Sequence, residues 1–172
     1  MDASDLDRLV RGQLAAALRF ATRLCGDPDA AEEIVQQSLF QAARGWRSFR
    51  GDSSFRSWFF RIIVNVSRDR SRSARADQEL VDDPVDARAA DPPGQLIDQE
   101  IAREIAREVS RLPDRQREVL VLVAYENHSI SEAATVLETN EQNVRTNLHL
   151  ARRRLRERLA RHLPAHWTQD AT

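Results

Sequence analysis

The chain contains no lysine, and all 26 of its basic side chains are arginine. It has a single cysteine, Cys25, which excludes an internal disulfide and is typical of a reducing compartment. No stretch approaches the roughly 20 apolar residues of a membrane span, and the acidic start, MDASDLDRLV, lacks the apolar run of a signal peptide. These absences predict a cytoplasmic protein with no membrane segment of its own.

Catalytic and metal-binding patterns are also missing. His128, His149, His162 and His166 are scattered, none of them forms a ligand cluster with Cys25, and no Gly-rich phosphate loop or triad-like arrangement is present. The sequence therefore predicts a protein that is not an enzyme and that needs no metal or cofactor.

The apolar residues recur every three or four positions and do not alternate with a period of two over the length of a strand. This predicts an all-α protein built from two small helical domains. Caps support individual helices: Asp27 precedes Pro28 at a helix start, and Ser53 or Ser54 precedes the helix that begins at Phe55. Helices are expected over residues 6–24, 28–44, 55–70 and 97–109, from Pro113 to about residue 123, and in a helix-turn-helix within 129–161.

Proline, glycine and aspartate mark the boundary between the domains. The segment around Pro84, Pro92, Pro93 and Gly94 has almost no large apolar side chain to bury, which is typical of a flexible linker. The predicted organisation is a first domain over residues 1–72, an acidic linker over 73–95, a second domain over 96–163 and a tail over 164–172.

Charge is segregated along the chain although the net charge is only −1. Arginines dominate residues 44–75, acids dominate 76–108, and arginines dominate again over 144–163. Two cationic patches on either side of an anionic spacer suit two separate contacts with one polyanion. Arginine favours planar, bidentate contacts with phosphate or guanine, although a GC-rich genome would explain its exclusive use equally well.

Residues 129–161 have the pattern of a helix-turn-helix. Ser129 with Glu132 forms a capping box, Thr139 with Gln142 repeats it, and Asn140 tolerates the special backbone angles of a tight turn.

In the second helix of this motif, Val144, Leu148, Ala151, Leu155 and Leu159 fall on one stripe that should face a core. The opposite side carries side chains that hydrogen-bond base edges or phosphates, as a recognition helix does. A solvated amphipathic helix with an arginine-rich outer face would show the same periodicity. The polar side comprises Gln142, Arg145, Thr146, His149, Arg152, Arg153 and Arg156.

The helix from Phe55 to Arg70 mixes aromatic residues with arginines, and the loop GWRSFRGDSS precedes it. Cations beside aromatic walls suit a groove for unpaired, stacked nucleotides. The alternative is that Trp58, Phe59 and Ile62 are simply core residues. The better candidates for nucleotide contact are Trp46, Arg50, Arg56, Arg61 and Asn65.

The helix that begins at Pro28 offers a third surface. Ile34, Val35 and Leu39 can face the core, while Phe40 lies outside that stripe and could anchor a protein partner. An ordinary solvated helix with acids near its N-terminus would look similar. The outer side carries Glu32, Glu33, Gln36, Gln37 and Phe40.

Residues 17–72, centred on AEEIVQQSLFQAARGWRSFRGDSSFRSWFFRIIVNVSRDRSR, resemble the region-two domain of extracytoplasmic-function (ECF) sigma factors of the sigma-70 family. Residues 96–160, with LPDRQREVLVLVAYENHSISEAATVLETNEQNVRTNLHLARRRLRERL, resemble their region-four domain. The resemblance implies a subunit that joins core RNA polymerase, through its clamp and flap regions, and directs it to promoter DNA. It also implies control by an anti-sigma factor and a linker that threads toward the RNA exit path of the polymerase.

The resemblance also implies roles for individual residues. Polymerase binding is implied for Glu32, Glu33, Ile34, Gln36, Gln37 and Phe40. Capture of the melted −10 element is implied for Trp46, Arg50, Arg56, Trp58, Arg61, Asn65 and Arg68. Reading of the −35 element as duplex is implied for Gln142, Asn143, Arg145, Thr146, Asn147, His149, Arg152 and Arg153.

Some positions depart from the family pattern. Gln37 stands where an acid is usual, Glu138 stands where the turn usually has glycine, and Glu126-Asn127-His128 lacks the customary glycine before the motif. A different class, a free-standing helix-turn-helix regulator, would read paired half-sites as a dimer. No dimer stripe is evident, and such a protein would leave the aromatic and arginine-rich helix unexplained.

Overall fold

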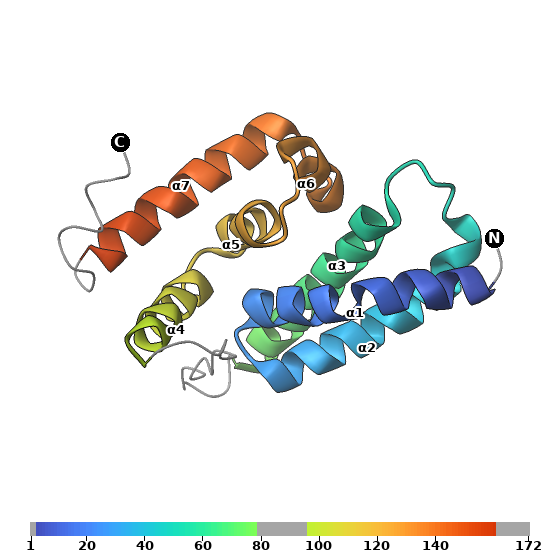
Figure 1. Cartoon of the computed structure of the whole chain (residues 1–172), viewed down its shortest axis with the longest axis horizontal. Helices are drawn as coiled ribbons and strands as arrows, with labels where there is room; N and C mark the ends of the chain where they lie inside the picture. The colour runs from blue at the N-terminus through green and yellow to red at the C-terminus, as the bar shows by residue number, and fades with distance from the viewer. Residues whose placement is uncertain (1–2, 79–95, 161–172) are drawn as a thin grey trace.

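The computed structural model describes residues 3–78 and 96–160, and every regular element within these ranges is a helix (Figure 1). The prediction of an all-α fold is confirmed. The predicted linker acids Asp82, Asp83, Asp86 and Asp91, and the tail with His162 and His166, lie outside the described residues. The first lobe comprises α1 (Ala3–Cys25), α2 (Pro28–Gly45), the short 3-10 turn η1 (Trp46–Ser48) and α3 (Phe55–Gln78). The second lobe comprises α4 (Leu96–Ser110), α5 (Asp114–Leu120), the π-helical turn η2 (Val121–Tyr125), α6 (Ile130–Leu137) and α7 (Glu141–Leu159).

The helix starts in the first lobe are those that the caps predict. The Asp27 carboxylate accepts hydrogen bonds from the backbone amides of Asp29 and Ala30, at 2.9 and 3.4 Å. The Ser54 hydroxyl accepts one from the amide of Ser57 at 3.1 Å, so Ser54 caps α3. These bonds satisfy amides that a helix N-terminus otherwise leaves without partners.

Helix α3 is longer than its sequence pattern predicts. It continues to Gln78, so the first residues assigned to the linker are helical. The reason is local, because residues 71–78 contain no proline or glycine and are rich in arginine and alanine, which favour helix. Arg72 adds an ion pair with Asp69 one turn earlier.

The helix-turn-helix has the predicted first cap but a different turn. The Ser129 hydroxyl accepts from the amide of Glu132 at 3.1 Å, and the Glu132 carboxylate accepts from the amide of Ser129 at 2.8 Å. The second cap is Asn140, whose side chain accepts from the amide of Asn143 at 2.8 Å; Thr139 was predicted in error.

The left-handed residue of this turn was also predicted wrongly. Glu138 has φ 53° and closes α6, whereas Asn140 has φ −90°. Asn127, just before the motif, has φ 54°. The two departures from glycine that the sequence shows here therefore coincide with positive backbone angles, which glycine adopts without steric cost.

The two lobes pack against each other (Figure 1). Helix α3 lies against α6, and α1 lies against α4, α5 and η2. The rings of Phe20 and Phe60 stack within the first lobe with centroids 4.6 Å apart, and Val136 and Val144 are buried in the second lobe. The buried residues of both lobes form one continuous hydrophobic cluster. The sequence predicted two lobes but not the interface between them.

Replacing Glu138 with glycine should stabilise the fold. A residue other than glycine in the left-handed region costs about 1 kcal/mol, and the ion pair of the exposed Glu138 with Arg61, at 3.7 Å, is worth at most about 1 kcal/mol. We expect Glu138→Gly to raise the free energy of unfolding by about 0.5 kcal/mol in urea titrations.

The control is Glu157→Gly on the exposed side of α7, where the backbone is right-handed. Glycine there should lower the free energy of unfolding by about 1 kcal/mol. Destabilisation by both substitutions would show that the backbone angle of Glu138 carries no strain.

Candidate nucleic-acid interface

The second helix of the helix-turn-helix, α7, presents the polar face that the sequence predicts. Val144, Leu148 and Ala151 are buried against the second lobe. Arg145 and Arg153 pair with exposed carboxylates of the same helix, at 2.7 and 3.7 Å, and such pairs are weak enough to exchange for a phosphate or a base. The predicted residues Gln142, Asn143, Arg145, Thr146, His149, Arg152 and Arg153 are exposed, and Asn147 is half-buried.

The loop before α3 is organised by an aromatic cluster. The ring of Trp46 stacks on Phe49 with centroids 5.6 Å apart and meets Phe55 edge-on at 6.0 Å. Trp58 lies 5.0 Å from Phe49 and is half-buried, while Arg50 is exposed. Trp46 itself is only 5% exposed. The sequence predicts that it contacts nucleotides, and the structure packs its ring within this cluster.

Three arginines predicted to bind the nucleic-acid strand point at the second lobe. Arg68 forms a two-pronged pair with Glu118, with both nitrogen to oxygen distances at 2.7 Å. Arg56 donates to the backbone carbonyl of Glu126 at 2.7 Å and to its carboxylate at 3.2 Å. Arg61 lies 3.7 Å from Glu138. Asn65, on the same helix, is half-buried.

The carboxylates on the other side of this interface are buried. Glu118 and Glu126 are each 4% exposed, and an unpaired charge at such depth is costly. Arg23 of α1 adds a second partner for Glu126 at 3.4 Å and lies over the Tyr125 ring at 4.7 Å. The hydrogen bonding that Arg68 donates to the Glu118 carboxylate is the main cause that raises the pKa of Arg68. The first lobe thus supplies the cations and the second lobe the anions.

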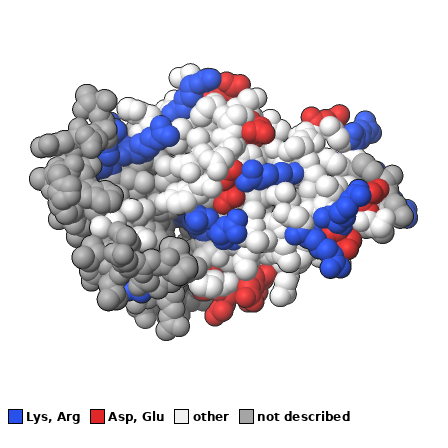
Figure 2. All heavy atoms as spheres, in the orientation of Figure 1, with Lys and Arg blue, Asp and Glu red and all other residues white. Residues whose placement is uncertain are grey.

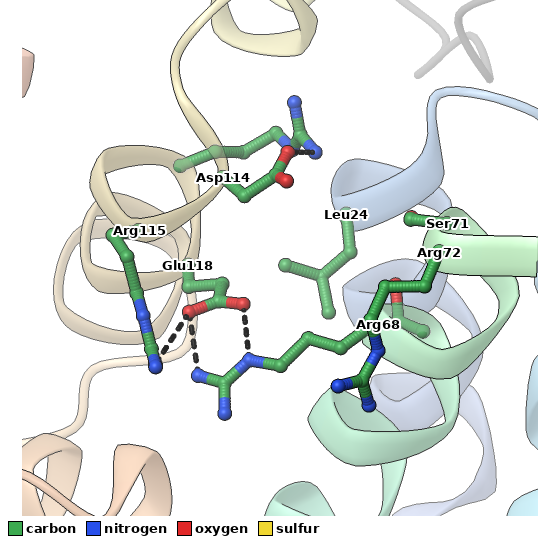
Figure 3. A pocket seen from close by; sticks show the side chains of 9 residues that line it. Leu24, Arg68, Ser71, Arg72, Asp114, Arg115 and Glu118 are labelled. Carbon is green, nitrogen blue, oxygen red and sulfur yellow. Dashed lines mark hydrogen bonds and ion pairs between the residues drawn. The ribbon is translucent and has the colours of Figure 1, made fainter. Parts of the chain in front are cut away.

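A cavity of about 230 Å³ lies between the lobes beside this pair (Figure 3). Arg68 reaches from α3 to Glu118 on α5, and Arg115 approaches the same carboxylate from its own helix at 3.5 Å. Arginine therefore meets Glu118 from both lobes. On the face drawn in Figure 2, blue and red atoms alternate and do not form one cationic field.

The outer face of α2 is exposed as predicted. Ile34, which the sequence predicts on the core side, is 1% exposed and supports this surface from beneath. Phe40 is 56% exposed, and the Arg44 guanidinium lies 5.6 Å from its ring. Glu33 forms an ion pair with Arg70 of α3 beside a groove of about 370 Å³. Glu32, Glu33, Gln36 and Gln37 are exposed.

His128 is a buried residue that the sequence did not single out as part of any site. Its ring packs on the ring of Phe60 in the first lobe, with centroids 5.3 Å apart, and the residue is 4% exposed. Burial is the main cause that lowers the pKa of His128. The positive charge of Arg56 lowers it further, and the negative charge of Glu132 acts in the opposite direction. Both ring nitrogens lack a hydrogen-bond partner among the described residues.

Glu118, Glu126 and His128 were missed as interface residues because their partners lie on another helix far away in the sequence. The only sequence signal was the departure from the family pattern at Glu126 to His128. Within residues 3–78 and 96–160 no cluster of side chains could hold a metal ion, and no helix there is long and apolar enough to cross a membrane.

Comparison with known proteins identifies both lobes. The family model of sigma-70 region 2 matches residues 9–76, and that of sigma-70 region 4 matches residues 102–155. The ECF RNA polymerase sigma factor EcfG of Rhodopseudomonas palustris is 30% identical over 136 residues, covering 79% of this chain and 75% of that protein. The ECF sigma factor SigM of Mycobacterium tuberculosis is 32% identical over 154 residues, covering 90% and 76%.

Solved structures resemble the whole arrangement. The sigma factor RpoE of Bartonella quintana, in complex with the anti-sigma factor NepR, matches with a TM-score of 0.79 at 25% identity, covering 92% of this chain and 98% of that one. CnrH in complex with the cytosolic domain of CnrY matches with a TM-score of 0.68 at 28% identity, covering 92% and 90%.

The buried His128 should make the interface sensitive to acid. The separated or unfolded chain takes up a proton near pH 6.5, while the packed imidazole resists it, so stability is intact above about pH 6.5 and falls as the pH drops toward the lower folded pKa. We expect wild-type protein to lose up to about 1.4 kcal/mol per pH unit in this window from His128 alone. Urea titrations from about pH 7.5 to 5.5 should show this loss as the difference from His128→Gln.

His149→Gln on the exposed face of α7 is the matched control and should follow the wild-type pH dependence. Equal acid sensitivity of wild-type protein and His128→Gln would contradict the prediction.

Proposed function

The chain belongs to the ECF sigma factors of the sigma-70 family, and from this premise we propose how its surfaces divide the work of promoter recognition. A sigma factor is a non-enzymatic initiation factor that binds core RNA polymerase and directs it to promoter DNA. The observation that carries the assignment is that region 2 and region 4 match in order along one chain. We take residues 1–72 and 96–163 as the two functional domains and 73–95 as the linker.

Helix α7 reads the −35 element as duplex DNA. Its exposed amide, hydroxyl and guanidinium groups suit base edges near the helix start and phosphates further along. The turn with Glu138 and the cap at Asn140 set the angle at which this helix leaves α6. The residues proposed for this contact are Gln142, Asn143, Arg145, Thr146, Asn147, His149, Arg152 and Arg153.

The loop after α2 and the start of α3 capture the melted −10 strand. Arg50 is exposed for phosphate contact, and Trp58, Arg61 and Asn65 are half-buried residues of the same helix, α3. The buried Trp46 holds this loop in place and does not stack on a base. Arg56 and Arg68 complete the cationic set.

The outer face of α2 binds core RNA polymerase. A large apolar ring at the centre of exposed polar side chains is the usual anatomy of an interface hot spot, and Phe40 supplies it. Glu32, Glu33, Gln36 and Gln37 form the polar rim, and Ile34 holds the helix to its lobe. Because polymerase lies in the cytoplasm, we propose that the protein acts there.

An anti-sigma factor controls this protein. Support comes from the RpoE and CnrH structures, whose complexes with NepR and CnrY match this chain over 92% of its length. A partner that holds both lobes would keep α2 and α7 from polymerase and promoter at once.

Reconstituted transcription tests the function. The protein should direct core RNA polymerase to start transcripts from a pool of genomic promoter fragments, and the starts should share upstream sequence words. Arg145→Ala should reduce this transcription about tenfold or more, because one lost bidentate base contact costs about 1–3 kcal/mol. Arg107→Ala is the control, since Arg107 is an exposed arginine of α4 that pairs with Glu104 of the same helix at 3.0 Å.

A free-standing regulator would behave differently. It would not bind core polymerase, and the protein alone would bind a palindromic duplex tightly and in a salt-sensitive way. That outcome would overturn the proposal.

Phe40→Ala should weaken binding to core polymerase without unfolding the chain. Truncating a central aromatic anchor costs at least about 2 kcal/mol, which is roughly thirtyfold in affinity. Leu14→Ala is the control, since Leu14 is an exposed apolar residue of α1 with 44% exposure. Titration of labelled polymerase, followed by fluorescence anisotropy, measures the affinity of each variant. An equal loss of affinity in the two variants would contradict a special role of Phe40.

A further inference from the structure

We infer that the chain inhibits itself: carboxylates of the second lobe occupy the arginines of α3 that capture the melted promoter strand. The strand and the second lobe then compete for the same side chains, and the closed arrangement is the resting form. The identity of the competing strand rests on the proposed function. The contacts between the lobes do not depend on it.

The chemistry of the competition is direct. A carboxylate and a phosphate both present two oxygens to the planar fork of a guanidinium, so one can replace the other. Glu118 uses both of its oxygens in this way on Arg68, at 2.7 Å each. The Glu126 carboxylate and backbone carbonyl both accept from a single terminal nitrogen of Arg56, at 3.2 and 2.7 Å.

The second lobe covers these arginines as well as pairing with them. The side chains of Arg56, Arg61 and Arg68 are only 35%, 30% and 23% exposed. His128 packs on Phe60 within the same interface. A nucleic-acid strand gains full access to the three guanidinium groups when α5 and α6 move away from α3.

The interface is not optimised as a permanent core. The Nε atoms of Arg56 and Arg61 are buried without an acceptor among the described residues, and so are both ring nitrogens of His128. Buried polar groups in a fixed core are nearly always satisfied. Opening returns these groups to water, or to a strand, and so offsets part of the cost of separating the lobes.

The two loop positions that depart from the family pattern favour the closed arrangement of the lobes. Glu138 holds a left-handed backbone angle that glycine would adopt freely, and its carboxylate faces Arg61. Glu126 precedes Asn127, the other residue of the described chain with positive φ that is not glycine. Both departures therefore place acids opposite the strand-binding arginines.

The test removes the buried carboxylates from the full chain. Glu118→Gln with Glu126→Gln should open the lobes, seen as a larger radius of gyration in small-angle X-ray scattering. The same variant should bind a short fluorescein-labelled DNA single strand of mixed sequence about tenfold more tightly, because apparent affinity scales with the open fraction. Fluorescence anisotropy measures that binding at fixed ionic strength.

The control is Glu104→Gln with Glu157→Gln. It removes the same charge from the same lobe, at carboxylates that pair with arginines of their own helices at 3.0 and 3.7 Å. It should stay compact and bind the strand only slightly more tightly than wild type. If circular dichroism shows that the double variant at Glu118 and Glu126 loses helix, the test uses Glu138→Arg instead. Glu138 is exposed, and an arginine at this position would repel Arg61.

Two results would overturn the inference: an interface variant as compact as wild type, or one that opens but binds the strand no better than the control. Failure of the proposed function would look different, because wild-type protein would then start no transcripts with core polymerase whatever the state of the interface. Normal initiation by the wild-type protein together with either result would leave only self-inhibition wrong.

Discussion

A carboxylate taken out of water must have a cation beside it, and this constraint organises the second lobe and its contact with the first. Glu108, Glu118 and Glu126 are each almost fully buried. Glu108 binds Arg111 and Arg158 and so ties α4 to α7, while Glu118 and Glu126 bind arginines of α3 and α1. Because removing one partner of such a pair costs about 3–5 kcal/mol, these arginines are not interchangeable with their exposed neighbours.

The exclusive use of arginine gains a structural meaning at this interface. A lysine at position 68 could place one ammonium near Glu118, but it could not make two parallel hydrogen bonds to its oxygens. The same fork that suits a carboxylate suits a phosphate. In the competition that we propose, arginine therefore lets one side chain serve the closed protein and the nucleic-acid complex, whereas composition bias alone explains its abundance but not its position.

Local signals in the sequence predicted the helices, the caps at Asp27 and Ser129, and the exposed face of α7, because periodicity and capping involve residues close together in the chain. The interface between the lobes was not predictable from such signals, since Arg68 and Glu118 are 50 residues apart. Trp46 was assigned to DNA because loop aromatics near arginines suit stacking, but Phe49, Phe55 and Trp58 surround it. Propensity favoured Asn140 for the left-handed position, whereas the turn places Glu138 there.

The closed interface also constrains how partners act on this protein. A ligand shifts a conformational equilibrium only by its difference in affinity for the two states, and moving from 1:99 to 99:1 takes about 5.5 kcal/mol. A ligand that needs the α3 arginines free, as we propose for the promoter strand, can supply this by binding only the open form. A partner that binds only the closed form would shift the equilibrium the other way. Because apparent affinity scales with the fraction of the binding-competent form, a carboxylate that strengthens closure weakens every ligand that binds only the open form.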